Sequence, residues 1–365
     1  MSSLECDILI IGGGIAGLSL ASALAPFSSV VLVESESTLG YHTSSRSARQ
    51  LIPSYGPGPV VDLTRRTLEL LSGVQSSTGL PLTVPRSFLL IGSEADVEAA
   101  AGASMRRVPH AEALELCPQL RPDAFGAAAI DTDSVGTDTD LLLEYHRRSA
   151  SDDGVLILTG APVTSARYDG TGWSVRAGYR SITAEVVVDA AGAWADGVAE
   201  LCGIAPQGLV PLRRTAAIVA AGNAPPVGTP MVAAADGSFY YRPDTEGVLI
   251  SPSESEPAEA GDAQPRPGDV ERLIDHLASV TTLDITSVRR SWTGLRTERA
   301  SGLPVVGFDV GHPGFFWHAG QGGYGFQTSS GIAELATVLL TGADPADLGA
   351  DPSRILAAAS ALRPA

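Results

Sequence analysis

The residues with the clearest chemical meaning form a glycine pattern near the start of the chain. Gly12, Gly14 and Gly17 follow the apolar run Ile8–Ile11 with G-x-G-x-x-G spacing, and Glu34 closes the next apolar run. Such glycines allow a tight turn, close approach of the backbone to a pyrophosphate, and packing of a helix on the strand. The N–H groups at the helix N-terminus attract phosphate, and the acid binds a ribose hydroxyl. The segment therefore predicts a dinucleotide-binding strand–helix–strand unit.

Two later segments combine apolar strands with small residues. Val186–Asp196 is expected to run from a strand through Ala190–Gly192 into a helix. Alone it would be an ordinary tight turn, but beside the first motif we interpret it as a second dinucleotide contact. Gly314–Gly331 is dense in glycine and leads into an expected helix at Ile332–Leu340. Loop filler is one interpretation. The one we favour is a nest of N–H groups at a positive helix end, which would stabilise a reduced flavin ring.

Single histidines and cysteines give weaker signals. His318 would supply positive charge or a proton at the glycine-rich segment, but we favour a packed strand histidine. Cys6, Cys117 and Cys202 lack CxxC or Cys/His ligand spacing, so we expect buried thiols, no disulfide and no metal site. Unpaired thiols favour a reducing, cytoplasmic location.

Charge and hydropathy narrow the classes of partner. The net charge of −17 argues against nucleic acid and anionic membrane as partners. All 24 basic residues are arginine, which excludes chemistry that needs a lysine of this chain. Ile8–Ala25 imitates a signal peptide or membrane span, but Glu5 and Asp7 precede it and glycines interrupt it. We interpret it as a buried strand–helix unit of a soluble protein.

The remaining pattern supplies elements that would hold these motifs in place. Ser251–Pro267 is acidic and rich in Pro, Ser and Ala, and we expect a surface loop there. Hydrophobic periodicity predicts helices at Val60–Ser72, Ala95–Ala101, Ala111–Leu116 and Thr139–Ser151, and strands at Leu82–Ile91, Val155–Leu158, Val163–Tyr168, Trp173–Ala177 and Glu185–Asp189.

Taken together, these motifs resemble a known family over nearly the whole chain. The sequence is similar to the FAD-dependent D-amino acid oxidase superfamily (glycine oxidase and sarcosine oxidase family), and within it to D-arginine dehydrogenase-type enzymes. The matching pieces are IIGGGIAGLSLA, VVDAAGAWAD, GFFWHAGQGGYGFQTS, Gly40–Arg49, Ser238–Arg242 and Trp292–Arg296.

The resemblance implies an α/β fold with a Rossmann-type FAD-binding domain and an α+β, mixed-sheet substrate domain. The expected boundaries are 1–80, 135–205 and 295–365 for the FAD-binding domain, and 81–134 and 206–294 for the substrate domain. It also implies an enzyme that oxidises the Cα–N bond of an amino acid by hydride transfer to flavin N5. The resulting imine hydrolyses to a 2-oxo acid, and O2 or another acceptor reoxidises the flavin. Because the cysteines fall outside the flavin motifs, we expect FAD to be bound non-covalently.

Site residues follow from the resemblance position by position. Arg296 matches the arginine that binds the substrate carboxylate, with Tyr240 and Tyr55 as nearby hydroxyl donors; these three are the expected catalytic residues. Tyr55 lies in Ser47–Gly58, which would form a mobile lid. The expected substrate-binding residues are Gln50, Tyr55, Ser87, Arg213, Tyr240, Arg296, Gly323 and Tyr324. The expected FAD-binding residues are Gly12, Gly14, Ile15, Ala16, Gly17, Glu34, Ser35, Thr43, Ser44, Ser45, Arg46, Ser47, Ala48, Gln50, Val163, Ala191, Gly192, Trp194, Gly294, Gly322, Gly323, Tyr324, Gly325, Phe326 and Gln327.

Two departures from the arginine-oxidising relatives change the expected substrate. Ser87 stands where those relatives place an acid, and Gln50 replaces a histidine. A cationic side chain would lack its partner, so we expect a neutral D-amino acid. The alternative is an N-substituted glycine or other secondary amine in a biosynthetic pathway, which would release glyoxylate or an aldehyde. Two other classes of protein fit the sequence less well. An NAD-dependent dehydrogenase would need only the first motif, and the other two motifs argue against it. A non-catalytic flavoprotein would not need Arg296 and Tyr240, and their presence argues against it.

Overall fold

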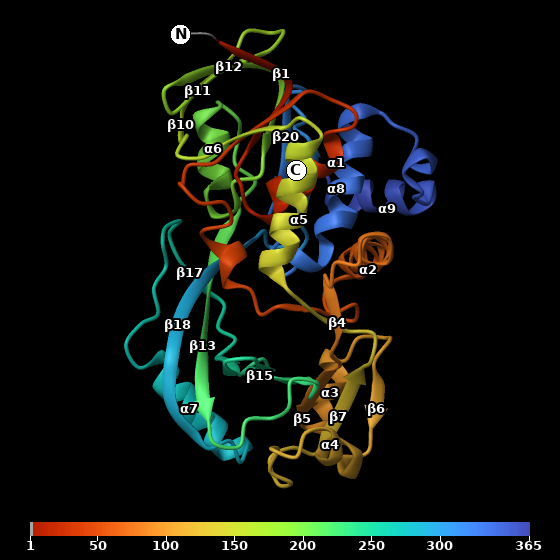
Figure 1. The fold of residues 1–365 in the computed structure, drawn as a ribbon, viewed down its shortest axis with the longest axis vertical. Helices are drawn as coiled ribbons and strands as arrows, with labels where there is room; N and C mark the ends of the chain where they lie inside the picture. Colours follow the sequence, from red (N-terminus) through yellow and green to blue (C-terminus); the bar gives the residue numbers. More distant parts are fainter. Residues whose placement is uncertain (1–2) are drawn as a thin grey trace.

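The computed structural model describes residues 3–365 and contains two large sheets (Figure 1). The first sheet has the order β10-β11-β12-β1-β2-β9, with β20 pairing β12 and β19 pairing β20. Its centre is parallel, because β1 runs parallel to both β2 and β12. Its strands are β1 (Leu4–Ile11), β2 (Val30–Val33), β9 (Leu156–Leu158), β10 (Val163–Tyr168), β11 (Trp173–Ala177), β12 (Arg180–Asp189), β19 (Val305–Phe308) and β20 (Phe315–Ala319).

The alternating residues of β1 show how this sheet is covered on both faces. Ile8 and Ile10 pack with helices α1 and α8 in one core cluster, and Leu9 and Ile11 pack with α6 and the β10–β11 hairpin in another. A parallel sheet buried on both faces requires such continuous apolar strands. The helices of the chain are α1 (Ile15–Leu24), α2 (Gly58–Thr78), α3 (Glu94–Ala100), α4 (His110–Leu116), α5 (Thr139–Asp152), α6 (Ala195–Leu201), α7 (Asp269–Val280), α8 (Gly325–Thr341) and α9 (Pro352–Leu362), with 3₁₀ turns η1 (Thr43–Arg46), η2 (Gly192–Trp194) and η3 (Pro345–Leu348).

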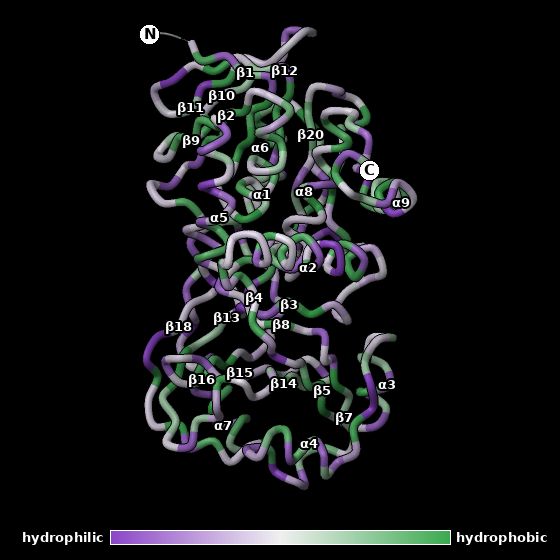
Figure 2. Tube along the Cα trace, turned by 45° about the vertical axis from the view of Figure 1, so that its right-hand side comes forward, coloured by the Kyte–Doolittle hydropathy of each residue, from purple (hydrophilic) through white to green (hydrophobic). Residues whose placement is uncertain are grey.

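The second large sheet is mixed, with the order β17-β13-β16-β15-β14-β5-β7-β6 and β18 paired to β13. Helices α4 and α7 pack on one of its faces. A three-stranded sheet, β3-β8-β4, lies between the large sheets, and α2 crosses the same level (Figure 2). The strands are β3 (Gln50–Leu51), β4 (Thr83–Pro85), β5 (Phe88–Gly92), β6 (Arg106–Val108), β7 (Ala127–Asp131), β8 (Val135–Thr137), β13 (Val210–Ala221), β14 (Met231–Ala234), β15 (Tyr240–Asp244), β16 (Gly247–Ser251), β17 (Glu256–Pro257) and β18 (Ile285–Glu298).

Most predicted elements are present with shifted bounds, and two differ in a way that changes their interpretation. The strand expected at Leu82–Ile91 is two strands, β4 and β5, which belong to different sheets and are separated by Arg86 and Ser87. Pro85 ends β4 because it has no N–H to donate.

The helix expected to begin at Ile332 instead begins at Gly325. Gly331 lies inside it because a Cβ there would come 2.7 Å from the carbonyl oxygen of Leu63 in α2. This glycine permits close helix–helix packing and does not mark a loop.

The acidic segment 251–267 begins at Ser251, the last residue of β16, and the rest of it forms a surface strap whose one strand is the short β17. Its backbone carbonyls accept hydrogen bonds from Arg46, Arg213 and Arg214, and Asp262 forms an ion pair with Arg46. The strap is therefore fastened to residues next to the site described below. Within residues 3–365, none of the helices combines the length and the apolar character that crossing a bilayer requires.

Candidate active site

A cavity of about 300 Å³ lies at the carboxyl ends of β1 and β2, and we call it the motif cavity. Gly12, Gly14, Glu34, Val163 and Trp194 are among its lining residues. Ligands of open parallel sheets bind at this edge. The first glycine motif and the Val186–Asp196 segment, both assigned to a dinucleotide, therefore lie around one space.

The glycines of the first motif have separate structural reasons. A Cβ on Gly12, which has φ +114°, would overlap the backbone of Ala190, and a Cβ on Gly17 would overlap the carbonyl oxygen of Gly12. A Cβ on Gly14 would lie 3.2 Å from Ser44 Oγ. Gly12 and Gly17 thus allow backbone packing, whereas Gly14 keeps the cavity wall open.

Hydrogen bonds fix the acid and the helix start of this motif. Glu34 Oε2 accepts from the N–H of Gly13 at 2.6 Å, and Oε1 accepts from the N–H of Glu36 at 2.8 Å. Ser44 Oγ accepts from the N–H of Ile15, the first residue of α1, at 3.0 Å. Ser44 belongs to the η1 turn, so this turn is attached to the N-terminus of α1. Ser44 also lines a second cavity.

A second cavity of about 280 Å³ continues from the first, with Thr43 and Ser44 lining both. We call it the arginine cavity, after Arg46, Arg214 and Arg296 in its wall. The segment Gly322–Gln327 closes one end. The N-terminus of α8 begins there at Gly325 and has no side-chain cap. Four N–H groups at a helix start need partners outside the helix. The negatively charged edge of a reduced flavin ring would be such a partner.

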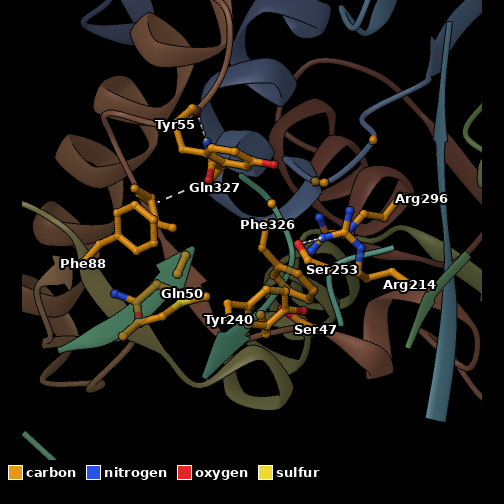
Figure 3. Close-up of a pocket in the computed structure, with 18 of the residues that line it drawn as sticks. Ser47, Gln50, Tyr55, Phe88, Arg214, Tyr240, Ser253, Arg296, Phe326 and Gln327 are labelled. Atoms are coloured by element: carbon orange, nitrogen blue, oxygen red, sulfur yellow. Dashed lines mark hydrogen bonds between the residues drawn. The ribbon is translucent and has the colours of Figure 1, made fainter. Parts of the chain in front are cut away.

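Arg214 and Arg296 lie side by side because of strand register. On β13 and β18, Arg214 pairs with Gly294 and Leu212 pairs with Arg296, so the two arginines share one face. Figure 3 shows both guanidinium groups on the same side of the cavity. In the structure of residues 3–365, the guanidinium of Arg296 has no hydrogen bond or ion pair to the protein, and a Cβ on Gly323 would lie 2.8 Å from its Nη1. Its donors are available to a ligand, and Gly323 leaves them room.

Arg214 has neutral hydrogen-bond partners on the strap. Its Nε, Nη1 and Nη2 donate to the carbonyl of Glu254 and the hydroxyls of Ser253 and Ser255, at 2.7, 2.9 and 2.8 Å. Burial, followed by the charge of Arg296, lowers the pKa of Arg214. Two neighbouring guanidinium groups without a bound carboxylate form a site for an anion.

Tyrosines complete the rim of the arginine cavity. Tyr55 and Tyr240 line it, and the Tyr55 ring lies 5.3 Å from the ring of Tyr324. The Tyr55 carbonyl accepts from Gln327 Nε2 at 3.1 Å (Figure 3), and that amide also donates to Thr64 Oγ1 in α2. Tyr55 thus lies in the cavity wall on a segment tied to α8.

The structure brings most of the predicted site residues to the two cavities. The motif cavity contains Gly12, Gly14, Glu34, Ser35, Thr43, Ser44, Val163, Ala191, Gly192 and Trp194. The arginine cavity contains Ile15, Thr43, Ser44, Arg46, Ser47, Ala48, Gln50, Tyr55, Tyr240, Gly294, Arg296, Gly322, Gly323, Gly325, Phe326 and Gln327.

Six predicted residues line neither cavity: Ala16, Gly17, Ser45, Ser87, Arg213 and Tyr324. Arg213 points to the opposite face of β13 from Arg214, since strand residues alternate, and donates to the carbonyl of Gln264. Ser87 lies between β4 and β5, where its carbonyl accepts from Met231 N. Ser45 donates back to the carbonyls of Tyr41 and His42.

Sequence reasoning missed Arg214 and the apolar wall of the arginine cavity. The sequence-based prediction named Arg213 as a substrate-binding residue and did not include its neighbour Arg214. Side chains alternate between the two faces along β13, so the two arginines point in opposite directions. Which of them faces the cavity is known only from the pairing of β13 with β18. Phe88, Leu90 and Met231 also line the cavity, but their pattern in the sequence is that of ordinary buried strands.

His318 and the cysteines lie away from both cavities. His318 is fully buried in β20, and burial lowers its pKa to about 4, so it is neutral at pH 7. This position agrees with the packed-histidine interpretation. Cys6, Cys117 and Cys202 are buried and free, and burial raises the pKa of the Cys117 thiol to about 12.

Comparison with known proteins finds a dimethylglycine dehydrogenase and a glycine oxidase among the relatives of this chain. The rat (Rattus norvegicus) mitochondrial dimethylglycine dehydrogenase is 29% identical over 393 residues, covering 96% of this chain and 45% of the relative. The chain thus spans less than half the length of that relative. The glycine oxidase of Geobacillus kaustophilus is 26% identical over 338 residues, covering 86% of this chain and 87% of the relative.

Solved structures confirm the fold. The glycine oxidase from Geobacillus kaustophilus superposes with a TM-score of 0.81 at 23% identity, covering 94% of this chain and 96% of that one. The L-proline dehydrogenase from P. horikoshii superposes with a TM-score of 0.83 at 20% identity, covering 93% and 94%. The predicted α/β fold with a Rossmann-type domain is therefore confirmed. The family model for FAD dependent oxidoreductases, named DAO, matches residues 7–339, and the chain belongs to that family.

Proposed function

We propose that this chain oxidises the Cα–N bond of a neutral D-amino acid with FAD. When bound, FAD would accept a hydride from the substrate Cα while the nitrogen loses a proton. The imine so formed takes up water and yields a 2-oxo acid and ammonia. The observation that carries this proposal is the pair of guanidinium groups of Arg214 and Arg296 at the end of a cavity that continues into the motif cavity.

The two cavities fit FAD along their length. Glu34 would bind the adenosine ribose, the backbone of Val163 would lie beside the adenine, and the N-terminus of α1 would face the pyrophosphate. The N-terminus of α8 would face the ring pyrimidine. No cysteine of residues 3–365 lines either cavity, which supports non-covalent binding.

Four polar residues of the arginine cavity would then bind the substrate. Arg296 would bind the substrate carboxylate, with Arg214 adding a second positive charge, and Tyr240 and Tyr55 would donate to the same group. Several donors would fix the position of the substrate carboxylate. The substrate would then be held with its Cα–H directed toward the flavin ring. Tyr55 on its α8-tethered segment would exclude water when the site is filled.

A second candidate substrate is an N-substituted glycine. The similarity to dimethylglycine dehydrogenases over 96% of the chain favours it. The same residues would bind its carboxylate, and the products would be glyoxylate and an amine, or glycine and an aldehyde.

We also propose the domain boundaries stated above. We further propose a cytoplasmic location, which the buried, free cysteines support.

An anaerobic substrate screen tests the proposal. The purified yellow protein would be mixed with D-amino acids, L-amino acids and N-alkyl glycines, and loss of visible flavin absorbance would be followed. We expect reduction by neutral D-amino acids or N-alkyl glycines and little reduction by D-arginine. Reduction by NADH alone would instead support a nicotinamide-dependent enzyme.

A further inference from the structure

One face of the mixed sheet lines the arginine cavity with apolar side chains. On β5 the residues Phe88 and Leu90 point toward the cavity, and on the parallel neighbour β14 their partners in register are Met231 and Ala233. Helices α4 and α7 pack on the opposite face of this sheet (Figure 1). Helix α3 lies on the cavity face, where it packs beside β7, and its last residue, Ala100, lines the cavity.

Within β5 and β14, neighbouring side chains on the two faces differ in exposure. Leu89 and Val232, which point toward α4 and α7, have 0% of their surface exposed. Phe88, Leu90 and Met231, next to them in the strands, keep 7%, 6% and 5%. Since Phe88, Leu90 and Met231 line the cavity, their small exposed area faces it, whereas Leu89 and Val232 are sealed.

Small side chains leave room in the cavity next to Phe88, Leu90 and Met231. Ala233 is partly exposed, and the same wall includes Ala100, the last residue of α3, and Met105 from the segment that follows it. Gln50 also lines the space, but its amide is engaged, with Nε2 donating to the carbonyl of Arg86 at 2.8 Å and to Ser134 Oγ at 2.7 Å. The space between these residues offers an apolar surface to a ligand.

Charge lies only at the other side of the cavity. Figure 3 shows Phe88 and Gln50 on one side and the guanidinium groups of Arg214 and Arg296 on the other. Across residues 3–365, no Asp, Glu or His lines this cavity. A ligand that matches both sides has a carboxylate at one end and an uncharged, apolar group at the other.

We propose that Phe88, Leu90, Met231 and Ala233 form a subsite for a bulky apolar substituent of the substrate, of the size of a phenyl ring. This inference rests on the proposed function and specifies its substrate class. The substituent would be carried on Cα of a D-amino acid or on the nitrogen of a glycine. Glycine, D-alanine and sarcosine leave the subsite empty and are poor substrates, and cationic side chains find no anion there.

Binding of non-reacting carboxylates to the oxidised holoenzyme tests the subsite without turnover. The dissociation constants of 3-phenylpropanoate and propanoate would be measured from the perturbation of the visible flavin spectrum. We expect the phenyl compound to bind at least about tenfold more tightly, the lower end of what apolar pockets achieve. Anaerobic reduction by D-phenylalanine and N-benzylglycine should exceed that by D-alanine and sarcosine by a similar factor.

Two variants locate the preference in the structure. Ala233→Leu should fill the subsite and lower the phenyl preference about tenfold, while propanoate binds as before. Phe88→Ala should weaken 3-phenylpropanoate by a similar factor through lost contact. Ala111→Leu, on the exposed side of α4, is the matched control and should change neither constant.

The outcomes separate this inference from the proposed function. If D-alanine or sarcosine reduces the flavin as well as the phenyl substrates do, the subsite is overturned and the function stands. An unchanged phenyl preference in both folded variants also overturns it. If no amino acid or N-alkyl glycine reduces the flavin, the proposed function fails and the subsite fails with it.

Discussion

Replacing Arg296 by methionine should impair substrate binding without impairing folding. The guanidinium of Arg296 has no hydrogen bond or ion pair to the protein among residues 3–365, and it lies beside Gly323 and Arg214. Its removal therefore leaves no protein group unpaired. A hydrogen bond to a charged group contributes about 1.5–3 kcal/mol, which corresponds to a loss of affinity of about 10- to 150-fold.

The neighbouring arginines give an internal comparison. Arg214→Met should weaken substrate binding and also lower the free energy of unfolding by about 1–3 kcal/mol, because three hydrogen bonds to the strap are lost. Arg213→Met should leave the KM within about twofold, since its side chain lies outside the cavity and donates to Gln264.

Steady-state kinetics and chemical denaturation of the three methionine variants measure both quantities. The expected result is a large rise in KM for the Arg296 variant with the denaturation midpoint of the parent. The reasoning is refuted if Arg213→Met raises KM as much as Arg296→Met does. It is also refuted if Arg296→Met keeps the parental KM.

Three more changes have defined outcomes. Gly14→Val should give folded protein without yellow colour, because a side chain there meets Ser44 and enters the motif cavity; visible and circular-dichroism spectra measure this, and a fully yellow variant would contradict it. Tyr55→Phe should lower kcat/KM while the affinity for FAD stays the same, as measured by stopped-flow reduction and FAD titration; an unchanged kcat/KM would remove the hydroxyl from the site. Burial lowers the pKa of His146 and of His318 from 6.5 to about 4. The unfolded chain therefore binds more protons between these pH values, and the free energy of unfolding should fall as the pH drops from 6.5 to 4. His146→Leu should flatten this pH dependence in urea denaturation, and a slope equal to that of the parent would contradict the assignment.

The first motif could be predicted from the sequence because its chemistry is local. Gly12, Gly14 and Gly17 act within one turn, and Glu34 directly follows the adjacent strand, so spacing alone brings Gly12, Gly14 and Glu34 to one cavity. Val163 and Trp194 also line that cavity, but they were assigned from family resemblance, since nothing local connects them with Gly12.

The arginine cavity could be predicted only in part because its walls come from distant strands. Arg214 reaches it through the pairing of β13 with β18, and Met231 through the pairing of β14 with β5. Neither pairing leaves a signal in the spacing of residues along the chain. The start of α8 was missed for a related reason, since the need for Gly331 depends on its contact with Leu63 of α2.

Anaerobic addition of a neutral D-amino acid or an N-alkyl glycine to the holoenzyme tests the central claim most directly. The account predicts that the flavin loses its visible absorbance and that one equivalent of 2-oxo acid or glyoxylate, or of an aldehyde, forms per reduced flavin. The Arg296→Met holoenzyme should need much more substrate for the same reduction. A flavin that stays oxidised with every such compound, yet is reduced by NADH, would contradict the account.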